Sequence, residues 1–103
     1  MSTYVLVHGA SAGAWMWKQV RSYLLAAGHE VYTPTLTGLG ERIHLASPNV
    51  NLDTHIQDVV NDLVYEDLRD AILAGGSYGG GVITGVADQV PERLQQLVYL
   101  DAF

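Results

Sequence analysis

Short apolar runs alternate with longer stretches of helical periodicity along the chain. The first run, residues 3–8, is β-branched and aromatic and stops at a glycine, which is typical of a strand buried on both faces. Three more runs are predicted to be strands in the same way: residues 29–33, 71–74 and 97–100. The chain therefore contains four predicted strands.

Three helices are predicted between these strands: residues 14–27, a stretch that begins near Thr54, and residues 79–90. The first has an apolar stripe and ends at Gly28, a residue suited to a helix stop. The second begins at a T-x-x-Q capping box made by Thr54 and Gln57. Its apolar residues fall at i, i+3, i+4, i+7 and i+8: Ile56, Val59, Val60, Leu63 and Val64.

Alternating strands and helices specify a parallel sheet with helices on both faces, joined by right-handed crossovers. The expected architecture is therefore a three-layer αβα arrangement. One connection, residues 34–52, is long and rich in turn-forming residues. Loops of that length in compact domains are often functional.

Composition narrows the function classes. The chain has 103 residues, enough for one small domain, and 49% of them are hydrophobic. Five basic residues against eleven acidic ones give a net charge of −6, which argues against nucleic-acid and anionic-membrane partners. The absence of cysteine excludes disulfides, a Cys-ligated zinc site and a thiol nucleophile. With no bilayer-length apolar run and no signal-peptide pattern, we expect a cytoplasmic protein.

Ser77 is the centre of a G-x-S-x-G pattern formed with Gly75 and Gly79, between an apolar strand and an amphipathic helix. A sharp strand-to-helix turn there would expose the hydroxyl at the carboxyl edge of the sheet, with glycines where side chains would collide. The following helix would aim free N–H groups at the site, that of Tyr78 among them. The competing interpretation is a glycine-rich turn that only lets strand and helix pack closely.

Several segments together resemble α/β-hydrolases of the plant-esterase and hydroxynitrile-lyase group. They are residues 5–10, 13–15, 27–31, 35–40, 75–80 and 98–103. The resemblance implies a partial α/β-hydrolase core with four parallel strands in the order 2-1-3-4. It also implies that Ser77 is the catalytic nucleophile, presented on the sharp turn known as the nucleophile elbow. The backbone N–H groups of Ala10 and Tyr78 would then form the oxyanion hole.

Family members are more than twice as long, so residues 1–103 correspond to their N-terminal half. The resemblance implies that the helical cap, the triad acid and the triad histidine belong to a C-terminal half outside residues 1–103. Gly76 stands where esterases of the group have His and lyases have Glu, and Gly81 replaces a larger apolar residue. Gly9 stands where the lyases carry a substrate-binding Thr, which argues against cyanohydrin cleavage.

A base inside the chain is not expected. His8 ends a buried strand and is expected to be a hydrogen-bonded structural residue, and His29 opens the second strand on a turn. His55 is expected on a solvated helix face with Asp58 and Asp62. Their i, i+3, i+7 spacing is compatible with a metal site, but a charged helix face is usually only solvated.

His44, in the long loop, is the least excluded base, but nothing in the sequence fixes it near Ser77. Asp101 follows the last strand, where some α/β-hydrolases place their acid, although in this group it is more often structural.

The predicted function is hydrolysis of a small carboxylic ester through an acyl-enzyme on Ser77, with no cofactor and no metal. Gly9, Ser11 and Trp15 are candidates for the substrate pocket. Trp17 and the loop 34–52 are further candidates, although core packing is the commoner role for both tryptophans. A second polypeptide carrying the C-terminal half is the expected partner, because the strand 97–100 would otherwise leave an open sheet edge. The alternatives are a hydroxynitrile lyase on the same scaffold and a non-catalytic module that binds a small ligand.

Overall fold

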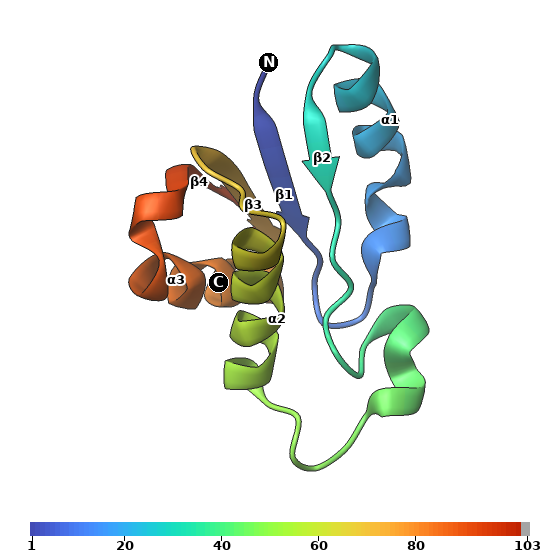
Figure 1. Ribbon diagram of the computed structural model, residues 1–103. Coiled ribbons are helices and arrows are strands. Elements are labelled where there is room, and N and C mark those ends of the chain that lie inside the picture. The colour runs from blue at the N-terminus through green and yellow to red at the C-terminus, as the bar shows by residue number, and fades with distance from the viewer. Residues whose placement is uncertain (102–103) are drawn as a thin grey trace.

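A four-stranded parallel sheet in the order β2-β1-β3-β4 forms the centre of the molecule (Figure 1). The computed structural model describes residues 1–101. The strands are β1 (Thr3–Val7), β2 (Glu30–Tyr32), β3 (Ala71–Gly76) and β4 (Leu94–Leu100). The predicted strand order and parallel direction are confirmed, and β4 begins three residues earlier than the apolar run indicated.

Helices cover both faces of the sheet, as predicted (Figure 1). They are α1 (Lys18–Ala26), α2 (Leu52–Tyr65) and α3 (Tyr78–Gln89), with three short 3₁₀ segments, η1 (Ala14–Trp17), η2 (Gly40–Leu45) and η3 (Pro91–Arg93). The single helix expected over residues 14–27 is thus η1 followed by α1. It ends in a left-handed turn at Gly28 (φ 90°), where the N–H of His29 bonds back to the carbonyl of Leu24.

The start of α2 differs from the prediction. Asn51, in extended conformation, is the N-cap, and its side-chain oxygen accepts the N–H of Thr54 at 3.2 Å. The Thr54 hydroxyl in turn accepts the N–H of Asn51 at 3.2 Å. The capping box therefore pairs Asn51 with Thr54, and the prediction of Thr54 with Gln57 was wrong, because Thr54 takes the third helical position instead of the cap.

Successive residues of the central strands point to opposite layers. Val5, Val7 and Leu73 enter the larger core beneath α2 and α3, whereas Leu6 and Ala74 enter a smaller core with Trp17 beneath α1. The two buried faces explain why these strands lack polar alternation. Within residues 1–101 no helix is long and apolar enough to cross a membrane.

Candidate active site

Ser77 occupies a strained turn between β3 and α3. Its backbone has φ 53° and ψ −120°, a region that non-glycine residues rarely adopt and that is often found at functional sites. A Cβ on Gly75 would lie 2.5 Å from the carbonyl oxygen of Gly79, and a Cβ on Gly79 would lie 2.5 Å from that of Val7. Both glycines are therefore needed for this close packing, and the side chain of Ser77 remains exposed.

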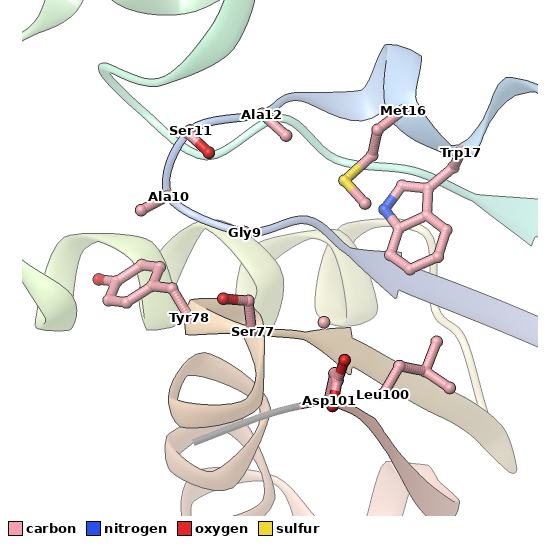
Figure 2. Close-up of a pocket in the computed structure, with 11 residues that line it drawn as sticks. Gly9, Ala10, Ser11, Ala12, Met16, Trp17, Ser77, Tyr78, Leu100 and Asp101 are labelled. Carbon is pink, nitrogen blue, oxygen red and sulfur yellow. The ribbon is translucent and has the colours of Figure 1, made fainter.

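A cavity of about 470 Å³ opens beside the Ser77 hydroxyl (Figure 2). It is lined by Gly9, Ala10, Ser11, Ala12, Met16, Trp17, Gly76, Ser77, Tyr78, Leu100 and Asp101. The loop after β1 lies over the serine, since a Cβ on Gly9 would be 3.8 Å from Ser77 Oγ. The structure thus brings together the predicted nucleophile, both predicted oxyanion donors and two of the predicted pocket residues, because β1 and β3 are adjacent and end at the same edge. These are Ser77, Ala10, Tyr78, Gly9 and Ser11.

Trp15 is not brought to this cavity. It is 61% exposed and lines a separate surface hollow with Lys18 and Arg21. Met16 and Trp17 line the serine cavity instead, because the 3₁₀ turn of η1 rotates them toward the sheet. Trp17 was a candidate pocket residue from sequence and does line the cavity. Met16 was not singled out, since the tight turn was interpreted as part of an ordinary α-helix.

Two backbone N–H groups near Ser77 have no competing partner. Tyr78 is the first residue of α3, where N–H groups have no acceptor within the helix. Outside helices and strands, none of the backbone hydrogen bonds found within residues 1–101 is donated by Ala10. The carbonyl of the same peptide unit, that of Gly9, accepts from the N–H of Ala12 at 3.2 Å and contacts His8 Nδ1 at 2.7 Å. In a planar trans peptide the N–H points away from a carbonyl held in this way.

The side chain of His8 holds the loop after β1 in place through hydrogen bonds. It is fully buried, its Nε2 accepts the N–H of Leu36 at 2.9 Å, and its Nδ1–H donates to the carbonyl of Gly9. Burial lowers the pKa of His8, while the bond to Gly9 and the charge of Glu41 oppose that shift. The neutral ring therefore fits both bonds, and the expectation of a hydrogen-bonded structural histidine is confirmed.

The expectation for His55 was wrong. Its side chain is only 6% exposed and faces Tyr78 and the loop, with both ring nitrogens in hydrogen bonds. A solvated position was inferred from the acidic neighbours of His55 in the sequence. Hydrogen bonds to partners from distant segments offset the cost of burying its imidazole. Among residues 1–101 no cluster of His, Cys, Asp and Glu could hold a metal ion.

No histidine lines the cavity beside Ser77 in the described part of the chain. His44 lies exposed in η2, and His29 Nδ1 accepts the N–H of Ser2 at 3.0 Å at the other end of the sheet. Asp101 does line the cavity, directly after β4, with a positive φ of 52°. Among the described residues the cavity is therefore lined by two serines and a carboxylate, and no histidine is present to act as the base.

The comparisons with known proteins agree with this geometry. The model of the Alpha/beta hydrolase family matches residues 4–103. A "Carbendazim hydrolyzing esterase" from Nocardioides sp. (strain SG-4G) is 53% identical over 103 residues, which cover all of this chain and 43% of that protein. An "Alpha-hydroxynitrile lyase" from Arabidopsis thaliana is 33% identical over 101 residues, covering 97% of this chain and 39% of that protein.

Among solved structures, an extracellular alpha/beta-hydrolase from a Paenibacillus species superposes with a TM-score of 0.92 at 41% identity, over 100% of this chain and 41% of that one. The chain thus spans about four-tenths of the length of these relatives. A match over nearly the whole chain, together with the strained serine between β3 and α3, decides the classification. The chain belongs to the α/β-hydrolase family, in the group that contains plant esterases and hydroxynitrile lyases.

Proposed function

We propose that this chain supplies the nucleophile and the oxyanion hole of a serine esterase that cleaves small carboxylic esters. The observation that carries the proposal is the backbone of Ser77, held at φ 53° with its side chain beside the cavity and under the Gly9–Ala10 turn. Strain of this kind persists only where the surrounding structure enforces it. Relatives of this chain are named as esterases, which supports the same reaction class.

In the proposed reaction, Ser77 Oγ attacks the ester carbonyl carbon, and its proton passes to a histidine. The carbonyl oxygen becomes an oxyanion that accepts hydrogen bonds from the N–H groups of Ala10 and Tyr78. Collapse of this intermediate breaks the bond to the alcohol oxygen, which leaves with the proton from the histidine. Water then hydrolyses the acyl-enzyme by the same steps and restores the serine.

The histidine and the acid that orients it are proposed to come from a C-terminal region like that of the longer relatives. A serine without a positioned base is a weak nucleophile at neutral pH. The outer edge of β4 offers a place for this region, because Leu97 and Val98 are only partly buried and Leu100 is 45% exposed. Whether this region belongs to the same polypeptide or to a second one, a further strand would cover these side chains.

The cavity favours an apolar substrate. Alanine, methionine, tryptophan and leucine side chains make up most of its lining, and Ser77 and Asp101 are the polar exceptions near the reacting centre, with Ser11 on the loop. Gly76 adds room, since a Cβ there would meet only the Leu100 carbonyl at 3.7 Å and the Trp17 ring at 3.9 Å. Carbendazim, named for the 53%-identical relative, is therefore the first compound to test as a substrate.

The test joins residues 1–103 to the C-terminal remainder of the 53%-identical esterase and treats the protein with a fluorophosphonate probe. We expect covalent labelling and ester hydrolysis, both lost in Ser77→Ala. The intact esterase is the positive control, and Ser22→Ala is the matched serine control that keeps its label on Ser77, because Ser22 is exposed in α1 and outside the cavity lining. A folded chimera that hydrolyses esters but is labelled elsewhere, or that stays unlabelled, would refute the proposal. Cyanide release from a cyanohydrin without ester hydrolysis would instead favour a lyase.

A further inference from the structure

Tyr78 is held by its side chain as well as by its place in α3. The Tyr78 hydroxyl lies 2.7 Å from Nδ1 of His55, and the two rings meet edge to face with centroids 5.6 Å apart. His55 Nε2 lies 2.8 Å from the carbonyl oxygen of Thr37. A carbonyl only accepts, so Nε2 carries a proton, and in the neutral ring Nδ1 then accepts from the tyrosine hydroxyl.

The same loop residue is also fixed from α2. The N–H and the hydroxyl of Thr37 donate to the two carboxylate oxygens of Asp58 at 2.7 and 2.8 Å. His55 and Asp58 are three residues apart and so lie on one side of α2. A continuous set of hydrogen bonds therefore runs from the first turn of α3 through His55 to the loop 34–52 and back to α2.

Packing alone does not explain this arrangement. A buried imidazole carries a desolvation cost that its hydrogen bonds must offset, whereas an apolar ring would fill the same space without that cost. The bonds do, however, fix the orientation of the tyrosine side chain. Fully satisfied buried networks rigidify the groups they join.

Rigidity at this position matters because of the peptide unit between Ser77 and Tyr78. Its N–H is one of the two oxyanion donors in the proposed reaction, and its orientation follows the strained backbone of Ser77. Relaxation of that strain would turn the N–H away from the cavity. An anchor on the Tyr78 side chain opposes such a rotation.

We propose that His55 is a positioning residue of the oxyanion site. Through the Tyr78 hydroxyl it holds the Tyr78 N–H toward the cavity, and through Thr37 it fixes this donor relative to the loop 34–52. The inference rests on the proposed function, because it assigns a role in that reaction to a residue that does not touch the substrate.

Two substitutions at His55 separate its two bonds. In His55→Asn the amide oxygen falls near the place of Nδ1 and can still accept from Tyr78, whereas in His55→Gln the amide nitrogen falls near Nε2 and can still donate to Thr37. Tyr78→Phe removes only the hydroxyl. Tyr99→Phe is the matched control, because it also removes a hydroxyl in a 2.7 Å hydrogen bond, in this case to Thr84 and outside the cavity lining.

In the chimera described above, we expect Tyr78→Phe and His55→Gln to lower kcat and the rate of fluorophosphonate labelling by about tenfold, with KM within about twofold, since a small misplacement of an oxyanion donor affects the transition state most. His55→Asn should recover most of this loss, and Tyr99→Phe should behave as the parent.

Equal rates in Tyr78→Phe and the parent would overturn the inference while leaving the proposed function intact. So would equal losses of activity in His55→Asn and His55→Gln proteins that are both fully folded. If a His55 variant does not fold, Tyr78→Phe decides alone, because it removes a single oxygen. A parent protein that is not labelled at Ser77 would instead remove the proposed function itself.

Discussion

Glycines two residues apart in α3 have opposite structural requirements. A Cβ on Gly79 would lie 2.5 Å from the carbonyl oxygen of Val7 and 2.8 Å from that of His8, and these backbone atoms cannot rotate away. A Cβ on Gly81 would meet no atom within 4 Å. The turn at Ser77 therefore requires glycine at position 79, whereas position 81 has room for a side chain.

We predict that Gly81→Ala raises the free energy of unfolding by about 0.5–1 kcal/mol, because alanine loses less backbone entropy in a helix. Gly79→Ala should lower it by at least about 1–3 kcal/mol through overpacking against β1. Denaturant unfolding of both variants provides the measurement, and each serves as the control for the other. A destabilising Gly81→Ala would show that this glycine has a packing role that the structure does not reveal.

At the scale of the element, the start of α2 depends on a side chain that periodicity did not identify. Asn51 has its oxygen on the N–H of Thr54, so we predict that Asn51→Ala costs about 1 kcal/mol of unfolding free energy. Asn49→Ala is the matched control, because Asn49 lies in the exposed turn just before the cap. Equal stability of the two variants, measured by denaturant unfolding, would contradict the assignment of the cap.

At the scale of the whole molecule, His8 links the stability of the fold to pH. Burial lowers its pKa below the ordinary value of 6.5, so the unfolded chain binds more protons than the folded one between the two pKa values. The contribution of His8 is therefore complete above pH 6.5 and is lost as the pH falls toward the lower, native pKa. The loss is at most about 1.4 kcal/mol per pH unit.

Urea unfolding at a series of pH values should show this fall, and His8→Gln, which cannot titrate, should have a shallower pH dependence. An NMR titration of the His8 imidazole in the unsubstituted protein measures the native pKa directly, without a variant. A native midpoint at or above 6.5 would refute the prediction, because the sign of the linkage would then change.

Much of this molecule is determined locally, and the sequence alone predicts that part. Buried apolar runs separated by helical periodicity specify four strands and their parallel direction, because each pattern reflects which faces of one segment are buried. Their order in the sheet was predicted from the resemblance to α/β-hydrolases. Gly75 and Gly79 around Ser77 predict the elbow, since a sharp turn excludes side chains beside it. Even the role of His8 follows from its position at the end of a buried strand.

The tertiary structure decided what depends on contacts between distant segments. Periodicity could not place His55 inside, because its partners, Tyr78 and Thr37, lie 23 and 18 residues away along the chain. Nor could it choose between Trp15 and Trp17 for the cavity, since a 3₁₀ turn directs side chains differently from an α-helix. Local pattern determines which elements form, whereas partners brought together by the fold determine which polar side chains are buried and where they point.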